Sequence, residues 1–172
     1  SPGTCYITVK SKSNPEVYAE VKVTVVANEE DAETTPTSSD ASQPTYVKGV
    51  LIANKSYALP KDYNPGLDPT TKSQFELLSA DAKKEGLDIH LSSGFRSYDY
   101  QKRIYNNYVN AYGQSTADTF SARPGHSEHQ TGLAIDVNSI DDSFAATPES
   151  AWLASNAHRY GFIIRYPKGK EH

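Results

Sequence analysis

The residues of this chain that are best suited to chemistry lie in the stretch 127–136, which reads Ser-Glu-His-Gln-Thr-Gly-Leu-Ala-Ile-Asp. A loop rich in turn-forming residues precedes it, and the apolar run 133–137 has the length and β-branched content of a buried strand. We therefore expect His129 on a loop and Asp136 in a strand or at its end. An imidazole nitrogen and a carboxylate oxygen on adjoining elements are ligands that a zinc ion accepts.

The spacing of this histidine and aspartate does not establish a metal site by itself. Asp136 follows His129 by seven positions, which matches neither zinc-finger spacing nor the His-Glu-x-x-His pattern. The simpler interpretation is a loop histidine in a hydrogen bond and an aspartate that caps a strand end. Gly132 and Ala134 favour the metal hypothesis, because small residues are needed where the backbone passes close to another group.

Composition restricts the class of protein. The 172 residues, 37% hydrophobic and 22% charged, are enough for one well-filled domain with a small appendage. A net charge of −4 argues against a nucleic-acid partner, which would call for a basic face. The sequence has no apolar run of 18 residues, so no transmembrane segment is expected in this chain. The single cysteine, Cys5, cannot form an internal disulfide.

The first 46 residues differ in pattern from the rest. Two β-like runs, 5–10 and 17–26, are separated by a turn, and the second alternates apolar and polar residues as a half-buried strand does. We expect a hairpin over 1–26, which resembles the last strands of a bacterial immunoglobulin-like domain; the alternative is a hairpin packed on the main domain. Residues 27–46 are acidic, polar and without apolar periodicity, which predicts a flexible linker.

The remainder, 47–172, has the pattern of one domain of helices and short strands. Apolar residues at helical spacing, such as Phe75 and Leu78, and capping residues such as Ser97 and Pro148 indicate where helices run. The predicted helices cover 70–85, 98–112 and 149–160, the predicted strands cover 50–52, 87–92, 133–138 and 162–165, and 114–126 is predicted to be a loop. This alternation lacks the signature of a doubly wound sheet, so we expect the α+β class.

Several motifs together identify a family resemblance. Ser127-x-His129-x-x-Gly132-x-Ala134-x-Asp136 resembles the signature of the zinc D-alanyl-D-alanine carboxypeptidases of the VanY type and of their relatives, the LD-carboxypeptidases that trim peptidoglycan tetrapeptides. Ser93-Gly94-Phe95-Arg96-Ser97 followed by Gln101 resembles the substrate-binding turn of that family, and Trp152-Leu153-x-x-Asn156-Ala157-x-x-Tyr160-Gly161-Phe162 resembles its C-terminal half. The resemblance covers about 47–172.

The resemblance implies a role for each of these side chains. His129 and Asp136 would be two of three ligands of a catalytic zinc, which usually keeps three protein ligands and one water. Arg96 would clamp the terminal carboxylate of the substrate, because its planar fork fits a carboxylate with two parallel hydrogen bonds. Gln101 and Ser127 would help to position the same peptide.

The resemblance also implies a biological setting. The enzyme would remove a C-terminal D-alanine from peptidoglycan stem peptides, and it would act outside the cytoplasmic membrane at the cell wall, as a monomer. Its fold would be a small antiparallel sheet with helices packed around it. The order of residues does not decide between a D-alanine and an L-residue such as lysine before the bond that is cut.

One part of the family pattern is not found in this sequence. The family carries its third zinc ligand and its general base in a Glu-Pro-Trp-His-like segment, which is expected beyond His172. We therefore assign no catalytic base in this chain, and we expect this 172-residue form to bind zinc weakly and to hydrolyse little. Two explanations stay open, a native chain that continues further and a metal-poor form.

Other functions remain possible on the same scaffold. An endopeptidase that cuts within the stem peptide would not need Arg96 as a carboxylate clamp. A non-catalytic module could recognise wall peptides, with the linker and hairpin as a tether. A purely adhesive module would explain the N-terminal strands but not the zinc signature.

Overall fold

The computed structural model describes residues 3–10, 18–25 and 42–165, the first two segments as backbone only. The chain forms two units, 1–35 and 36–172. In the first unit, β1 (Gly3–Lys10) pairs antiparallel with β2 (Tyr18–Val25), with Gly3 opposite Val25 and Lys10 opposite Tyr18. This confirms the predicted hairpin. Its relation to an immunoglobulin-like domain stays a prediction, and most of the predicted linker falls outside the described residues.

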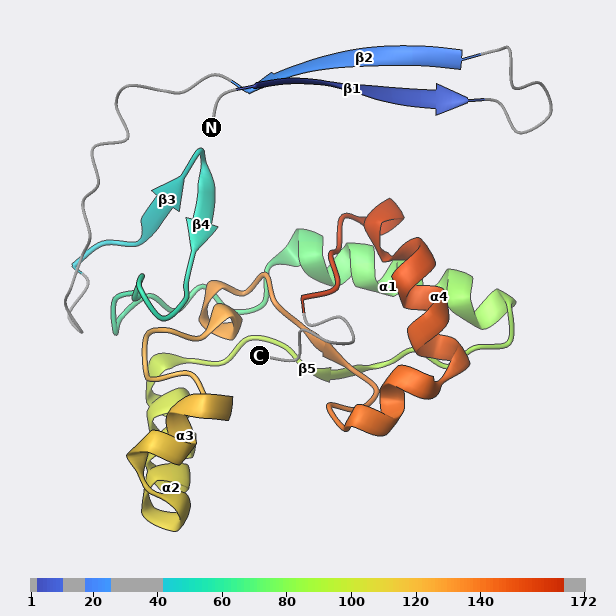
Figure 1. The fold of residues 1–172 in the computed structure, drawn as a ribbon. Helices are drawn as coiled ribbons and strands as arrows, with labels where there is room; N and C mark the ends of the chain where they lie inside the picture. Colours follow the sequence, from blue (N-terminus) through green and yellow to red (C-terminus); the bar gives the residue numbers. More distant parts are fainter. Residues whose placement is uncertain (1–2, 11–17, 26–41, 166–172) are drawn as a thin grey trace. The chain divides into compact units, whose positions relative to one another are not determined.

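The described part of the second unit contains four α-helices and two antiparallel strand pairs. The strand pairs are β3 (Thr45–Val47) with β4 (Val50–Ile52) and β5 (Leu91–Ser93) with β6 (Asp136–Val137), and the helices are α1 (Pro69–Lys84), α2 (Tyr98–Tyr112), α3 (Gln114–Phe120) and α4 (Pro148–Asn156). In Figure 1, α2 and α3 lie together on one side of β5, and α1 and α4 lie on the other. Helices around a small antiparallel sheet confirm the α+β class.

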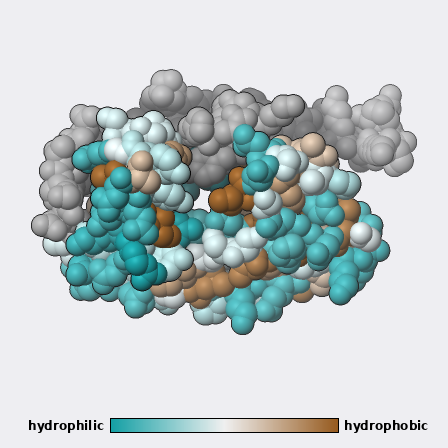
Figure 2. Space-filling view, turned by 90° about the horizontal axis from the view of Figure 1, so that it is seen from below, coloured by the Kyte–Doolittle hydropathy of each residue, from teal (hydrophilic) through white to brown (hydrophobic). Residues whose placement is uncertain are grey.

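The core of this unit lies between α1 and α4. Phe75, Leu78 and Ala82 of α1 pack with Trp152 and Leu153 of α4, and all five are less than a tenth exposed. Their spacing in α1 places one apolar face toward α4. Burial of a leucine of this kind stabilises the fold by about 2 kcal/mol. The face of the unit that Figure 2 shows is mainly hydrophilic, with apolar patches between polar residues.

Local capping residues set the limits of the helices. Asp68 accepts a hydrogen bond from the Thr71 amide at the start of α1, and Ser97 accepts one from the Tyr100 amide at the start of α2. Gly113, at φ 80°, ends α2 in a conformation that favours glycine. The predicted helices over 70–85 and 98–112 are therefore confirmed to within a residue.

The strand pair β5–β6 is shorter than the predicted strands over 87–92 and 133–138. Leu91 pairs with Val137 and Ser93 with Asp136, with an irregularity between Leu91 and Ser93. Beyond this short pair, the side chain of Asn138 takes the place of backbone hydrogen bonds between the two segments. It accepts from the His90 amide at 3.1 Å and donates to the carbonyl of Asp88 at 2.6 Å. The pair thus serves mainly to bring Ser93 and Asp136 side by side.

Two sequence-based predictions were wrong, and a third was confirmed only in part. The segment 114–126, predicted to be a loop, contains α3, and 162–165, predicted to be a strand, forms none. The predicted helix 149–160 is α-helical only to Asn156 and continues as a 3-10 turn, Ala157–Tyr160. α3 lacks an apolar period of its own and is held by α2, where the Tyr105 hydroxyl donates to Asp118 at 2.8 Å. None of the helices in the described residues is long and apolar enough to cross a membrane.

Candidate active site

Two segments far apart in the sequence meet at the N-terminal end of β6. One is the arginine turn, residues 93–97, and the other is the signature stretch, residues 127–136. The amide of Arg96 donates to the carbonyl of His129 at 3.1 Å, and a ring nitrogen of His129, Nδ1, lies 2.7 Å from the carbonyl oxygen of Gly94. His129 lies in a 3-10 turn, Glu128–Thr131, and Asp136 is the first residue of β6, which agrees with the expected positions on a loop and at a strand end.

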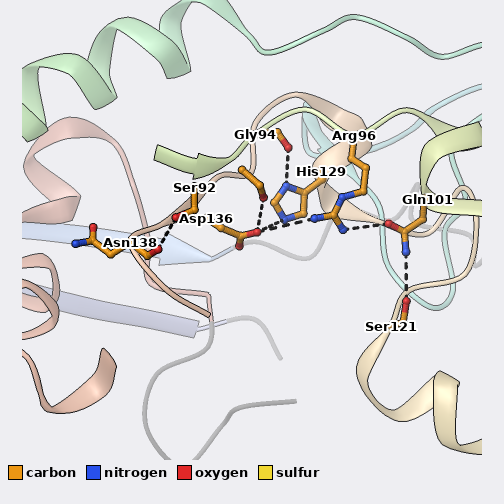
Figure 3. A network of polar contacts seen from close by, with 9 residues as sticks. Ser92, Gly94, Arg96, Gln101, Ser121, His129, Asp136 and Asn138 are labelled. Carbon is orange, nitrogen blue, oxygen red and sulfur yellow. Dashed lines mark hydrogen bonds and ion pairs between the residues drawn. The ribbon is translucent and has the colours of Figure 1, made fainter. Parts of the chain in front are cut away.

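His129 and Asp136 face each other directly (Figure 3). Their Nε2 and Oδ2 atoms are 3.3 Å apart, and both side chains are partly exposed. A carbonyl oxygen can only accept a hydrogen bond, so Nδ1 of His129 carries the proton that it donates to Gly94. Nε2, the atom that faces the carboxylate, carries a proton when it donates to Asp136. In the neutral ring it carries the lone pair instead, which is the tautomer that a metal ligand needs.

Asp136 is held as a carboxylate by its neighbours. The hydrogen bond with His129 lowers the pKa of Asp136 most, the Ser93 hydroxyl donates to Oδ2 at 2.5 Å, and the charge of Arg96 adds to the effect. Partial burial acts in the opposite direction but is outweighed. The group is therefore ionised at neutral pH, as a metal ligand must be.

Arg96 lies beside the same carboxylate and is fixed by Gln101. Its Nη2 is 4.0 Å from Oδ2 of Asp136, and its Nη1 donates to Oε1 of Gln101 at 3.1 Å (Figure 3). The amide nitrogen of Gln101 in turn donates to the carbonyl of Ala122 at 2.6 Å and lies 3.4 Å from Oγ of Ser121. One polar network therefore joins a guanidinium, a histidine and a carboxylate.

Residues 64–172 match the family described as VanY D-alanyl-D-alanine carboxypeptidase. The chain belongs to the VanY family. Among solved structures, the LdcB LD-carboxypeptidase shares 49% identity at a TM-score of 0.62, and DacB from Streptococcus pneumoniae D39 shares 49% at 0.63; each match covers 71% of this chain and 67% of the other. A VanY D,D-pentapeptidase mutant in complex with Zn(II) shares 29% at a TM-score of 0.57, over 69% of this chain and 77% of the other.

Two curated relatives of this chain are also named as carboxypeptidases. YodJ of Bacillus subtilis, which is named as a carboxypeptidase, is 41% identical over 147 residues, 71% of this chain and 54% of that protein. A D-alanyl-D-alanine carboxypeptidase of Enterococcus faecalis is 28% identical over 139 residues, 70% of this chain and 52% of that protein. The chain spans about half the length of the curated relatives it matches.

The two other predicted substrate-binding residues of this VanY-family chain are buried. Gln101 is only 1% exposed and accepts a hydrogen bond from Arg96, so it is placed to orient the arginine. Ser127 is 4% exposed and immediately precedes the 3-10 turn, where its carbonyl accepts from the amide of Gln130 at 3.0 Å. Direct contact of either with a peptide stays a prediction.

Sequence reasoning missed the role of Gln130. Its side chain is fully buried, and its amide nitrogen donates to the carbonyls of Pro60 at 2.8 Å and Tyr63 at 3.1 Å. Its Oε1 is buried and has no hydrogen-bond partner in the part of the chain that the structure describes. Gln130 therefore fastens the segment 60–63 to the signature stretch. The role of Gln130 depends on a contact between residues 70 positions apart, so no local sequence pattern could have predicted it.

His126 lies in the same loop but faces elsewhere. Its Nδ1 is 2.7 Å from the carbonyl oxygen of Asn54, and its side chain makes no hydrogen bond or ion pair with His129 or Asp136. Across residues 42–165, no group of three or more histidine, cysteine, aspartate or glutamate side chains is arranged to hold a metal. The described residues thus offer a pair of candidate ligands.

The donors of this pair fit zinc. Zinc–nitrogen and zinc–oxygen bonds of about 2.0–2.1 Å at a tetrahedral angle hold two ligand atoms roughly 3.3–3.4 Å apart. The observed separation of Nε2 and Oδ2, 3.3 Å, equals that spacing. The tautomer of His129 and the ionised Asp136 agree with it, so the pair can supply two ligands of a zinc ion.

Proposed function

We propose that this VanY-family chain is a zinc-dependent carboxypeptidase that removes a C-terminal D-alanine from peptidoglycan stem peptides at the cell wall. The observation that carries the proposal is the position of Arg96. A guanidinium suited to a terminal carboxylate lies 4.0 Å from the carboxylate of the candidate metal pair. In a peptide, the terminal carboxylate and the last peptide bond are separated by one residue, roughly 3.5 Å of chain.

Arg96 accounts for exopeptidase specificity. Its guanidinium can offer two parallel hydrogen bonds to a terminal carboxylate, and its hydrogen bond to Gln101 fixes the plane of the fork. A peptide held in this way presents its last carbonyl at His129 and Asp136. A peptide without a free C-terminus has no group to match the arginine, which favours this function over an endopeptidase.

His129 and Asp136 are the residues that would hold the metal. When bound, a zinc ion supplies polarisation of the scissile carbonyl and activation of a water molecule. The hydrogen bonds of His129 to Gly94 and of Asp136 to Ser93 fix the orientation of both ligands. Such supporting contacts commonly change metal affinity about 10- to 100-fold when they are lost.

The comparisons favour an L-residue before the terminal D-alanine. The chain shares 46–49% identity with structures of LD-carboxypeptidases and 29–30% with structures of the vancomycin-resistance D,D-peptidases. We therefore propose that a tetrapeptide that ends in L-lysyl-D-alanine is a better substrate than a pentapeptide that ends in D-alanyl-D-alanine.

Release of free D-alanine tests the proposal. The full-length protein, supplied with zinc, is incubated with both peptides and with a tetrapeptide whose C-terminus is amidated. We expect fastest release from the free tetrapeptide and a loss on the order of 100-fold in kcat/KM for Arg96→Ala, because a charge-assisted clamp is removed. Arg103→Ala, on the exposed side of α2, is the control. Binding of the peptides without any release would support a non-catalytic module instead.

A further inference from the structure

Three exposed aromatic side chains meet where α3 packs beside the C-terminal half of α2 (Figure 1). Tyr108, Tyr112 and Phe120 are 38%, 60% and 52% exposed. The ring of Phe120 stands edge-on to both tyrosines, with its centroid 4.9 Å from that of Tyr108 and 6.1 Å from that of Tyr112. We call these three side chains the aromatic patch, to which the function proposed above gives no role.

The packing of α3 against α2 uses only part of these rings. Buried groups already join the two helices, since the Tyr105 hydroxyl donates to Asp118 at 2.8 Å and Ala117 is fully buried. Tyr112 and Phe120, by contrast, leave more than half of their surface to solvent. Aromatic side chains that are exposed together mark a binding surface, whereas apolar residues exposed singly need no explanation.

The sequence around the aromatic patch carries no charge. Residues 104–117 contain no aspartate, glutamate, lysine, arginine or histidine, although 22% of the chain is charged. The exposed polar side chains of this run are tyrosine, asparagine, glutamine, serine and threonine. Asp118, the next charged residue, is paired with Arg123 at 2.7 Å. The patch therefore suits a neutral ligand that forms hydrogen bonds.

The size of the aromatic patch favours a small ligand over a second protein. An aromatic side chain offers roughly 200 Å² of surface, so the exposed parts of the three rings amount to about 300 Å². A stable interface between two proteins takes about 800 Å² from each partner. Self-association through this patch alone would be weak, whereas a flat ring of a small ligand needs far less area.

A sugar chain matches these features. A pyranose ring has an apolar face of C–H groups that packs flat on an aromatic ring, and its hydroxyl and acetamido groups form hydrogen bonds at its edge. The hydroxyls of Tyr108 and Tyr112 make no hydrogen bond with any described residue, so they are available to such a ligand.

The position of the aromatic patch agrees with the polymer that carries the proposed substrate. Peptidoglycan stem peptides branch from glycan strands of neutral, N-acetylated amino sugars. Tyr108 follows Tyr98, the first residue of α2, by ten residues, which is about 15 Å along the helix. An extended tetrapeptide spans roughly 14 Å. A stem peptide with its C-terminus at Arg96 is therefore long enough for its sugar-bearing end to reach the patch.

We propose that the aromatic patch binds the glycan strand of peptidoglycan, with sugar rings stacked on Tyr112 and Phe120. The identity of this polymer rests on the function proposed above, and the patch adds a second contact between the protein and the wall. A glycan held at the patch raises the effective concentration of its stem peptides at Arg96, because their binding becomes intramolecular. The benefit applies to the polymer and not to free peptides.

Binding of a sugar chain without a peptide tests the aromatic patch independently of turnover. The probe is chitotetraose, a neutral tetramer of N-acetylglucosamine, titrated into the full-length protein by calorimetry. We expect a Kd on the order of 1 mM or lower. Tyr112→Ala, and Phe120→Leu, which keeps apolar bulk but removes the flat ring, should each weaken binding about fivefold. Tyr100→Ala is the control, because Tyr100 is 46% exposed on the same helix but lies outside the patch.

Release of D-alanine provides a second measurement in the zinc-supplied protein. The ratio of the rate with insoluble peptidoglycan to the rate with a free tetrapeptide should fall about fivefold in Tyr112→Ala, because only the polymer contacts the patch. Tyr100→Ala should leave this ratio as it is in the unaltered protein.

The possible results separate the glycan site from the carboxypeptidase. Absence of chitotetraose binding, or binding that Tyr112→Ala and Phe120→Leu weaken no more than Tyr100→Ala, overturns the glycan site. A dimer in sedimentation that Tyr112→Ala dissociates assigns the patch to a second copy of the chain and overturns it as well. Absence of D-alanine release from both substrates, with chitotetraose binding intact, overturns the carboxypeptidase and leaves the sugar-binding patch standing.

Discussion

Gly132 lies so close to Gly66 that a Cβ on Gly132 would come within 2.2 Å of the carbonyl oxygen of Gly66. The amide of Asp68 donates to the carbonyl of Gly132 at 3.0 Å, so a hydrogen bond also joins the two segments. Gly132 ends the 3-10 turn that carries His129, and its φ of 77° lies in the left-handed region. The absence of a side chain at Gly132 therefore lets the signature stretch pack closely against the segment that leads into α1.

Gly132→Ala should lower the free energy of unfolding by about 3–4 kcal/mol, because it combines backbone strain with a clash against backbone atoms that cannot move aside. Gly113→Ala is the matched control, since Gly113 has a φ of 80° but nothing within 4 Å of an added Cβ. The control should lose only the strain, about 1 kcal/mol. Urea unfolding of both variants measures the difference, and equal losses would contradict the clash.

Gln130 offers a second test of the contacts that hold the signature stretch in place. Two carbonyls, of Pro60 and Tyr63, accept from its amide nitrogen in a fully buried position. A carboxylate there would face two acceptors and find no donor, so Gln130→Glu should lose about 3 kcal/mol or more at pH 7. Gln130→Met, which removes the side-chain amide at similar length and adds no charge, should lose less. Thermal unfolding of the two variants side by side decides.

The pH dependence of Gln130→Glu separates charge from shape. Burial raises the pKa of the new carboxyl above its value in the unfolded chain, about 4.3. The loss of unfolding free energy is therefore full at neutral pH, and it shrinks as the pH falls through the raised pKa toward the unfolded value. The protonated acid can donate to one carbonyl. A loss that is independent of pH between 7 and 4 would show that the defect is one of packing.

Helix positions were largely predictable from the sequence because their causes are local. Ser97 and Gly113 mark the two ends of α2 through their own hydrogen bonding and backbone freedom, and no distant residue is needed. α3 was not predictable, because its stability comes from contacts with α2. The ring of Phe120 packs edge-on against Tyr108 with centroids 4.9 Å apart, a contact that no local pattern reveals.

The distinction between local causes and distant contacts applies to the candidate site as well. The donor types of His129 and Asp136 could be chosen from the sequence, and so could Arg96. Their assembly could not, since it depends on the carbonyl of Gly94 fixing a ring 35 positions away. Gln101 was predicted to help position the peptide, which stays a prediction; its side chain is buried and contacts Arg96. Burial of a polar side chain follows from packing, which the order of residues does not state.

The surface cluster of Asp118, Arg123 and Tyr105 predicts a pH dependence of stability. Hydrogen bonds from Arg123 and then from Tyr105 lower the pKa of Asp118 to about 2. Its folded pKa is thus below its unfolded value, so its contribution is present above about pH 4 and is lost as the pH falls toward 2. Asp118→Asn should lower the melting temperature at pH 6, and the difference from the unaltered protein should vanish near pH 2. A difference that is constant with pH would contradict this.

The contact between Gln101 and Arg96 predicts a specific kinetic defect. Gln101→Glu would keep an acceptor for Nη1 of Arg96 but add a negative charge beside the proposed clamp. The new carboxylate competes with the terminal carboxylate of the peptide, so we expect KM to rise about tenfold with a smaller change in kcat. Lys102→Gln, which makes the same change of −1 in charge on the exposed side of α2, is the control. A loss confined to kcat would contradict competition for Arg96.

The proposed metal pair can be tested by zinc binding without any measurement of turnover. Calorimetric titration of the full-length protein should show that His129→Ala and Asp136→Asn each lower zinc affinity by at least 100-fold, since each removes a ligand atom of the facing pair. Ser93→Ala removes only the hydroxyl that donates to Asp136, so it should lower affinity about tenfold. His126→Ala is the control, because its ring contacts the carbonyl of Asn54 and not the pair. Equal effects of His126→Ala and His129→Ala would remove the assignment of His129 as a ligand.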